Sequence, residues 1–343
     1  MGNSLGMWIV GAGLLAASPT ADVTRYEFSQ VHMGMPFTLI LYAPDEAAAN
    51  RASTAAFERI AELDRTLSDY KPDSELSRLT ATAGEGRAVP VGNDLWRVLL
   101  ASQALSGQSS GAFDITVGPY VKLWRRARRD QQFPSEKRLA EAREQVGYQH
   151  LKLDAEQKTA ILERPGMRLD PGGIAVGYAL DEAGEVLREQ GIESFLFDGS
   201  GDVLAGDPPP DKSGWSLAIA SPLDDTPPSR VLTLANAAAT TAGDTMQFVE
   251  LAGKRFSHIV DPRTGLGLTT RLGVTIVAPD AMTADSLDTA ISVLGIEDGT
   301  RLLEKYPGAA ALFVQVTDDG SVVESETPSF KQYVAPMSIN TSP

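Results

Sequence analysis

The spacing of apolar residues changes repeatedly along the chain between a strand-like and a helix-like period. The apolar run 37–43 (FTLILYA) predicts a strand, and Asp45 behind it is a suitable N-cap for a helix. The apolar residues of that helix repeat at spacings of four, three and four, as Ala56, Ile60, Leu63 and Leu67. They form one core-facing stripe.

Helices and strands are interspersed throughout, without internal repeats. Further helices are expected over 94–105 and 135–146, from the Gly172-Gly173 pair to Gly191, and over 282–294. Further strands are expected at 194–197, 216–220, 231–234, 256–260, 274–277 and 310–316, with a surface loop at 207–214. This order predicts an α+β or mixed-sheet fold rather than regular βαβ repetition. No long linker divides it, so residues 23–343 are expected to form a single domain, or two closely packed subdomains.

Composition narrows the class of protein. The 343 residues include 30 basic and 45 acidic side chains, a net charge of −15, which argues against a nucleic-acid-binding protein. With 43% hydrophobic and 22% charged residues, the chain has the composition of a soluble globular enzyme. The absence of cysteine excludes disulfides, thiolate metal sites and a cysteine nucleophile, and three histidines are too few for a multi-histidine metal cluster.

The first 22 residues are interpreted as an export segment. The apolar run 7–17 is too short to span a bilayer, and small residues follow it, as they do near a secretory cleavage site. Residues 15–18 (LAAS) also resemble a lipoprotein attachment box with serine in place of cysteine, although no Lys or Arg precedes Arg25. We therefore expect a periplasmic protein or one at the outer face of the inner membrane. A start-site artefact or a buried N-terminal segment is the alternative.

Two glycine-containing motifs are weak signals. The segment 107–111 (GQSSG) matches a hydrolase nucleophile elbow around Ser109, but a helix precedes it and the extended segment 113–116 is expected to follow. The segment 198–202 (DGSGD) lacks the third glycine of a dinucleotide-binding loop and is better explained as a tight turn between two strands.

Three other groups of residues are candidates for a functional site, and for two of them a structural role is an equally simple explanation. Asp285 and Thr289 are four residues apart in a predicted helix and Asp288 lies close to the same face, which suits Mg²⁺ or a solvated surface. His258, within a predicted strand before an Asp-Pro turn, is either a titratable functional group or a structural histidine. The segment 170–173 (DPGG) opens a helix and is a natural place for an anion.

Taken in order, the motifs resemble those of the ApbE family of flavin transferases. The matching segments are 33–37 (MGMPF), 67–79 (LSDYKPDSELSRL), 111–124 (GAFDITVGPYVKLW), 170–181 (DPGGIAVGYALD), 198–202, 240–244 (TTAGD), 257–265 and 281–289. Each segment alone is modestly specific, but the ordered set is specific and extends over about residues 31–316.

The resemblance implies the family's T-fold-like architecture, with mixed, largely antiparallel sheets and packed helices. It implies an Mg²⁺-dependent enzyme that transfers the FMN half of FAD to a Ser or Thr hydroxyl of a target protein and releases AMP. The acceptor is expected to be a protein such as a subunit of a membrane redox complex.

The resemblance also assigns site residues. The metal positions match Gly173 (through its backbone carbonyl), Asp285, Asp288 and Thr289. The FAD pocket matches Met33, Tyr70, Ala112, Phe113, Asp114, Asp170, Val176 and Ile259, and the catalytic histidine matches His258.

Three positions depart from the family pattern: Val176 replaces a charged residue, Thr80 an Asn and Ala242 a Ser. Since Val176 makes no polar contact, a non-catalytic flavin-binding protein stays open as an alternative. So does an Mg²⁺-dependent FAD pyrophosphatase, in which water replaces the hydroxyl acceptor. A serine hydrolase built on Ser109 is the most remote alternative.

Overall fold

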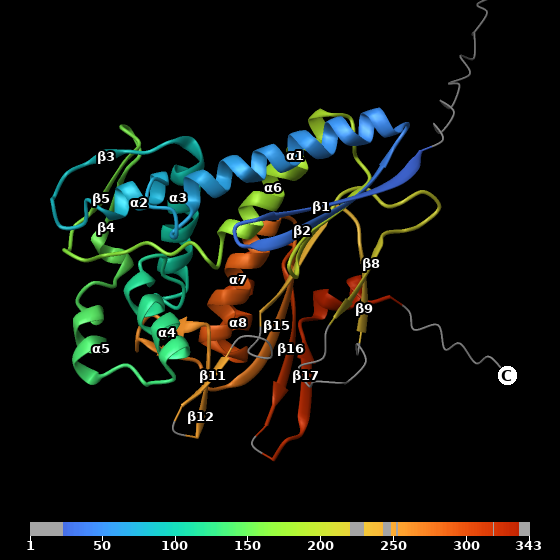
Figure 1. Cartoon of the computed structure of the whole chain (residues 1–343). Helices are drawn as coiled ribbons and strands as arrows, with labels where there is room; N and C mark the ends of the chain where they lie inside the picture. The colour runs from blue at the N-terminus through green and yellow to red at the C-terminus, as the bar shows by residue number, and fades with distance from the viewer. Residues whose placement is uncertain (1–22, 220–229, 243–247, 252, 318, 336–343) are drawn as a thin grey trace, which may run out of the picture.

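An antiparallel sheet of eight strands forms the centre of the molecule (Figure 1). The computed structural model describes residues 23–219, 230–242, 248–251, 253–317 and 319–335, so the expected export segment 1–22 lies outside it. In spatial order the strands are β1 (Thr24–His32), β2 (Met35–Ala43), β6 (Phe195–Gly199), β7 (Asp202–Ala205), β10 (Ala237–Ala242), β15 (Arg271–Ala278), β16 (Ala310–Val316) and β17 (Val322–Glu326). No helix in the described ranges is long and apolar enough to cross a membrane.

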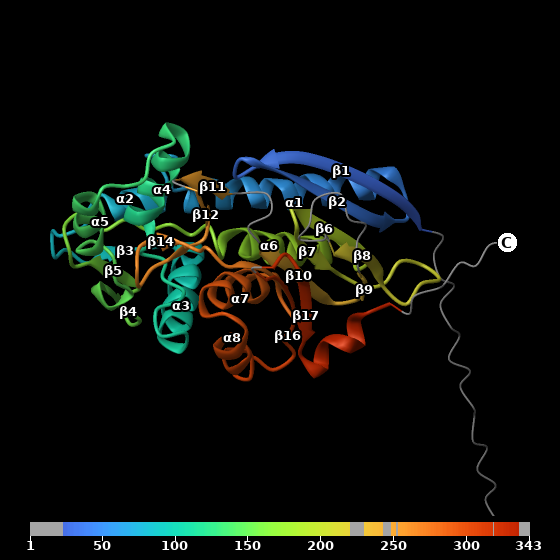
Figure 2. The same cartoon turned by 90° about the horizontal axis from the view of Figure 1, so that it is seen from below.

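Three long helices cover one face of this sheet: α1 (Glu46–Leu67), α6 (Ala175–Glu189) and α7 (Ala281–Leu294) (Figures 1 and 2). The predicted cap of α1 is confirmed, because the Asp45 carboxylate accepts a hydrogen bond from the backbone N–H of Ala48 at 2.7 Å. The predicted stripe is confirmed as well, since Ala56, Ile60, Leu63 and Leu67 are all buried. Helix α1 therefore packs against the core through the apolar face that the sequence predicted.

A smaller apolar layer covers the opposite face. It consists of the hairpin β8 (Trp215–Ile219) and β9 (Arg230–Leu234) and of the 3₁₀ helix η2 (Pro328–Tyr333). Trp215, Leu232 and Phe330 are buried there against sheet residues. Both faces of the inner strands are thus shielded from water, whereas the edge strands β1 and β17 are mostly exposed.

Most of the remaining elements gather at one end of the molecule, on the left in Figure 1. They include α2 (Glu75–Thr80), α3 (Asn93–Gln108), α4 (Gly118–Asp130), α5 (Glu136–Arg143), η1 (Tyr148–His150) and a sheet of β3 (Val89–Pro90), β5 (Thr159–Leu162) and β4 (Leu151–Asp154). Other short elements are β11 (Phe248–Leu251), β12 (Lys254–Ser257), β13 (Val260–Asp261), β14 (Leu266–Gly267) and α8 (Ile296–Leu303). One buried apolar cluster joins this end to the main sheet, for example through Leu95, Leu151 and Phe197.

The α+β prediction is confirmed, and so is the turn between β6 and β7 at residues 200–201. Two local predictions are wrong. Residues 113–116 are not extended but form a turn that leads into α4, which the sequence reasoning missed. His258 does not lie within a strand: it lies in a bend between β12 and β13, where the backbone N–H of Ile259 donates to the Ser257 hydroxyl at 3.1 Å.

Candidate functional site

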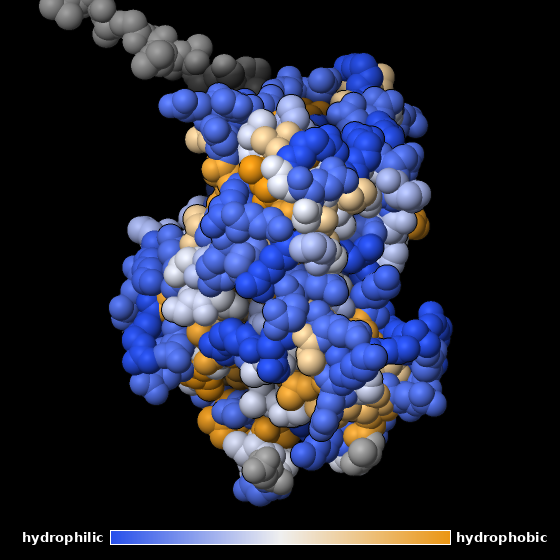
Figure 3. Space-filling model, turned by 90° about the vertical axis from the view of Figure 1, so that its left-hand side faces the viewer, coloured by the Kyte–Doolittle hydropathy of each residue, from blue (hydrophilic) through white to orange (hydrophobic). Residues whose placement is uncertain are grey.

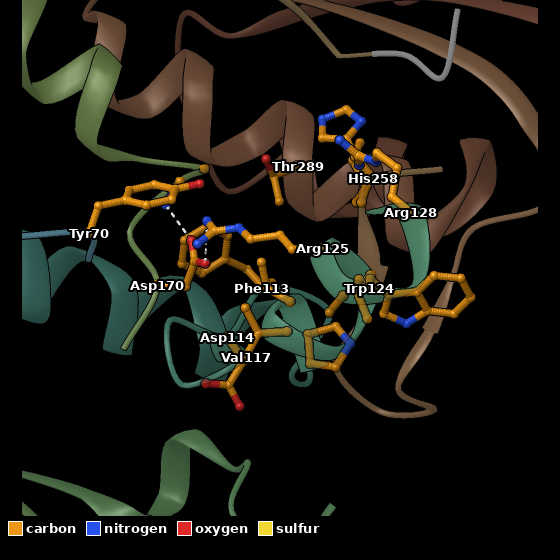
Figure 4. A pocket seen from close by; sticks show the side chains of 17 residues that line it. Tyr70, Phe113, Asp114, Val117, Trp124, Arg125, Arg128, Asp170, His258 and Thr289 are labelled. Atoms are coloured by element: carbon orange, nitrogen blue, oxygen red, sulfur yellow. Dashed lines mark hydrogen bonds and ion pairs between the residues drawn. The ribbon is translucent and has the colours of Figure 1, made fainter. Parts of the chain in front are cut away.

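A pocket lies where α4, the turn before α6, the bend at His258 and α7 meet (Figure 4). Its volume is about 270 Å³, near the lower limit for ligand pockets, which is room for a part of a dinucleotide but not for all of one. Nine of the thirteen predicted site residues line it: Tyr70, Ala112, Phe113, Asp114, Asp170, Gly173, His258, Ile259 and Thr289. Residues that are far apart in sequence are thus brought to one cavity.

An arginine that the sequence reasoning missed ties two walls of the pocket together. The Arg125 guanidinium on α4 forms ion pairs with Asp69 at 2.6 Å and with Asp170 at 3.1 Å. Its carbon Cζ also lies 4.5 Å from the centre of the Tyr70 ring. Burial raises the pKa of Asp170, and the positive charge of Arg125 opposes that shift.

Tyr70 is unusually open for an aromatic residue, with 74% of its surface exposed. Since Arg125 covers its ring at one place, the ring is held in position although little of it is buried. A fixed and accessible aromatic ring at a pocket mouth is a suitable surface for stacking a flat heterocycle.

Asp114 has a different position from the other acids. One carboxylate oxygen accepts hydrogen bonds from the backbone N–H and the hydroxyl of Thr116, at 2.8 and 2.7 Å, and the other accepts one from the backbone N–H of Tyr148 at 2.8 Å. In Figure 4 its carboxylate points away from the centre of the pocket. Burial raises its pKa. Asp114 therefore fixes the turn that carries Phe113 toward the pocket, and its oxygens are occupied within the protein.

The predicted metal positions meet at the contact between the 170–173 turn and α7. A Cβ atom placed on Gly173 would lie only 2.6 Å from the Thr289 hydroxyl oxygen, so glycine permits this close approach of backbone to side chain. Asp285, one turn before Thr289, accepts a hydrogen bond from the backbone N–H of Gly177 at 2.9 Å. The backbone at Gly173 thus touches Thr289, and the Asp285 carboxylate lies one helical turn away on the same helix.

Asp288 lies behind this group. One of its oxygens accepts from the Thr240 hydroxyl at 2.8 Å and the other from the Thr289 hydroxyl at 3.3 Å. Neither Asp285 nor Asp288 lines the open pocket, and both are buried. Asp288 is therefore placed to orient Thr289 from the second layer.

Buried negative charge is concentrated here. Burial and the neighbouring Asp202 raise the pKa values of Asp285 and Asp288 well above the ordinary range, and burial with Asp198 raises the pKa of Asp202 to about 7. Such a group of acids is costly to bury unless a cation accompanies it. No cluster of three or more His or acidic side chains with ligating geometry occurs in the described part of the chain. The oxygens at hand are the Asp285 carboxylate, the Thr289 hydroxyl and the backbone at Gly173, which are hard ligands of the kind that Mg²⁺ prefers together with water or phosphate.

Two predicted FAD positions lie outside the pocket lining. Val176 is 7% exposed and packs in the core, close to where a side chain on Gly199 would stand. Met33 lies in the turn between β1 and β2, with a left-handed backbone (φ 51°), and packs partly against the core. His258, in contrast, lines the pocket on the side opposite Tyr70 (Figure 4).

Comparison with known proteins gives a consistent result. Residues 33–313 match the model of the ApbE family. The chain is 31% identical to the FAD:protein FMN transferase of Haemophilus influenzae, over 79% of this chain and 80% of that protein. It is also 31% identical to the Vibrio cholerae protein of that name, over 96% and 99%.

Solved structures agree with the family match. The flavin transferase ApbE of Vibrio cholerae superposes with a TM-score of 0.81 at 28% identity, covering 91% of this chain and all of that one. The apo flavinyl transferase ApbE of Pseudomonas stutzeri gives a TM-score of 0.80 at 30% identity, covering 91% and 97%. The resemblance predicted from the ordered motifs is confirmed: this chain belongs to the ApbE family.

Proposed function

We propose that this protein is an Mg²⁺-dependent FAD:protein FMN transferase. The acceptor Ser or Thr oxygen attacks the FMN phosphorus, a new P–O bond forms, the pyrophosphate bond breaks and AMP leaves. The observation that carries the proposal is one pocket lined by the accessible ring of Tyr70, by Thr289 and by His258, with buried acidic side chains next to Thr289 on α7. The relatives that bear this activity by name match most of the chain.

Within this proposal Asp285, Thr289 and the Gly173 carbonyl hold Mg²⁺, and Asp288 keeps the Thr289 hydroxyl oriented. Mg²⁺, when bound, supplies charge neutralisation on the transferring phosphate. The protein side chains do the rest: Tyr70 holds a ring of FAD, Arg125 fixes Tyr70, and His258 accepts the proton of the attacking hydroxyl.

The location of the enzyme belongs to the same proposal. We place it in the periplasm or at the outer face of the inner membrane, because residues 1–22 have the composition of an export segment. Its acceptor there is a protein such as the exposed part of a membrane redox subunit. Fractionation of cells and sequencing of the mature N-terminus test the location. Recovery of the protein with the cytoplasmic fraction would refute it.

AMP release distinguishes transfer from hydrolysis. We expect slow conversion of FAD when the enzyme and Mg²⁺ are alone, since a transferase pocket must keep water from the phosphorus. Adding an acceptor peptide with one threonine should speed AMP release and give a fluorescent peptide that carries covalently bound FMN. The same peptide with alanine in place of the threonine should do neither. Rapid AMP release that ignores the acceptor would instead establish an FAD pyrophosphatase.

Tyr70→Ala is expected to weaken FAD binding about tenfold, because stacking on an aromatic ring contributes roughly 1–3 kcal/mol and 1.4 kcal/mol is a decade of affinity. Tyr70→Phe keeps the ring and should bind FAD like the wild type. Titration of FAD against each protein, followed by flavin fluorescence, gives the dissociation constants. Unchanged affinity in Tyr70→Ala would show that the exposed ring does not touch FAD.

His258→Ala is expected to slow transfer about a hundredfold through loss of the proton acceptor, while FAD affinity changes little. The pH profile adds a second readout: the wild-type rate should rise as the imidazole loses its proton, and that limb should vanish in the variant. His150→Ala is the matched control, since His150 lies on η1 outside the pocket and contacts Glu163. An equal loss in both variants would contradict a specific role for His258.

A further inference from the structure

Helix α4 separates the candidate FAD pocket from a second hollow. Val121, Trp124 and Arg128 face the pocket, whereas Lys122, Arg126 and Arg129 face the hollow, and Arg125 contributes to both. The hollow encloses about 740 Å³ between α4, α5 and residues 166–168, and we call it the basic groove. It therefore begins one helix width from the place where the chemistry is proposed.

The charge of the basic groove is opposite to that of the protein. Six cations and one carboxylate line it: Lys122, Arg125, Arg126, Arg129, Arg138, Arg168 and Glu141. The whole chain carries −15, so cations are concentrated here against the general balance. The end of the molecule that carries α5 is mainly hydrophilic, with apolar residues only in small patches (Figure 3). A ligand of this surface is recognised by charge more than by apolar burial.

The positive charge is only partly neutralised within the protein. Arg126 and Arg129 share one carboxylate, Asp130, at 3.0 and 2.9 Å. Lys122 and Arg138 take part in no ion pair with any residue that the structure describes. The groove thus keeps a surplus of cations for an external anion.

We propose that the basic groove binds an acidic segment of the acceptor protein, adjacent in its sequence to the Ser or Thr that receives FMN. This inference rests on the proposed function: α4 lines both hollows, so residues that flank an acceptor hydroxyl in the pocket come within reach of the groove. Binding these residues by charge holds the hydroxyl at the pocket mouth and discriminates between hydroxyl-bearing proteins.

A peptide fits the groove better than a membrane or a polynucleotide does. The surface is concave, whereas a lipid bilayer requires a flat or protruding one. An anionic bilayer or a long nucleic acid also meets the negative charge of the rest of the molecule, while a short segment feels charges only within about 8–10 Å at physiological salt. Local complementarity therefore decides in favour of a short acidic segment.

The test uses two fluorescent peptides with one threonine each, one followed by four glutamates and the other by four glutamines. Fluorescence anisotropy with the full chain, with and without FAD, measures binding independently of turnover. We expect the acidic peptide to bind about tenfold more tightly than the neutral one at low salt, and this difference to shrink as salt rises. Equal affinities would overturn the inference.

The double variant Lys122→Glu/Arg138→Glu removes the two unpaired cations without touching the FAD pocket. It should weaken acidic-peptide binding about tenfold and leave FAD affinity and the affinity for the neutral peptide unchanged. The matched control Arg25→Glu/Arg301→Glu makes the same change in net charge on β1 and α8, outside the groove, and should bind like the wild type. If both double variants lost affinity for the acidic peptide equally, the effect would come from net charge alone, and the proposal that the basic groove binds the peptide would be refuted.

Two further outcomes separate the alternatives. Sedimentation with phosphatidylglycerol-containing vesicles that depends on Lys122 and Arg138, without preference for the acidic peptide, would identify a membrane surface and overturn the proposal. FAD titration is the independent check of the proposed function: if FAD does not bind while the acidic peptide does, the transferase assignment fails and the basic groove stands.

Discussion

The Asp285→Asn variant is expected to lose about a hundredfold or more in the rate of FMN transfer while it folds normally. The substitution removes one full charge from the proposed Mg²⁺ site but keeps an oxygen that accepts the hydrogen bond from Gly177. Thr289→Val should cost less, since it removes a neutral ligand. Rates measured against Mg²⁺ concentration test this, and full activity of Asp285→Asn at limiting Mg²⁺ would contradict the metal assignment.

Thermal unfolding gives Asp285→Asn a readout apart from turnover. Asp285 lies close to two other acids, Asp202 and Asp288. Burial raises the pKa of Asp285, and the like charges of these two neighbours raise it further. Neutralising it should raise the Tm of the metal-free protein by a few degrees. Mg²⁺ should then stabilise the wild type against unfolding and have little effect on the variant.

Asp280→Asn is the matched control for both measurements. Asp280 caps the same helix, α7, and accepts a hydrogen bond from the backbone N–H of Thr283 at 2.8 Å. Asparagine is an equally good N-cap, so the same chemical change should leave both the turnover and the response to Mg²⁺ unaltered.

Features set by local sequence were predictable. The stripe of α1 and the cap at Asp45 depend on residues within a few turns of one another, and both appear in the structure as expected. The turn at 200–201 likewise follows from its own glycine and from the apolar strands on each side. The apolar residues of 282–294 predicted the helix α7, on which Asp285 and Thr289 both lie.

Elements without a regular apolar period were missed. Strand β1 is mostly exposed, so no alternation marks it, and it is held by its pairing with β2. In α4 the buried residues Tyr120, Trp124 and Ala127 lie in a segment with one lysine and four arginines, which hides the stripe. The bend at His258 depends on contacts with other segments, since the Ser257 backbone N–H donates to Leu268 across a short loop.

Contacts between segments that are distant in the sequence could not be predicted from local sequence patterns. Arg125 pairs with Asp69 and Asp170, which are 56 and 45 residues away, and nothing near Arg125 indicates those partners. Asp288 was assigned to the metal site by resemblance, and its contact with Thr240, 48 residues away, could not be predicted from the residues around it. Val176 occupies a core position that its apolar character suits.

Gly177→Ala is expected to destabilise the protein by about 3 kcal/mol or more through overpacking. Glycine within a helix is unfavourable, so its presence in α6 needs a reason. A Cβ atom there would lie 2.2 Å from the Ala281 carbonyl oxygen and 2.8 Å from Met282 Cα, and both belong to the backbone of α7. The two helices would have to separate, which would also pull the Gly177 N–H from Asp285.

Differential scanning calorimetry should therefore show a Tm lower by roughly 6–12 °C for Gly177→Ala, with a matching loss of Mg²⁺-dependent stabilisation. Gly107→Ala is the control, because Gly107 lies in α3 with no atom within 4 Å of a Cβ placed on it. That change should be neutral or slightly stabilising, as alanine is the better helix former. If Gly177→Ala matched Gly107→Ala in both Tm and Mg²⁺ response, α6 and α7 would not be held at the distance on which the proposed metal site depends.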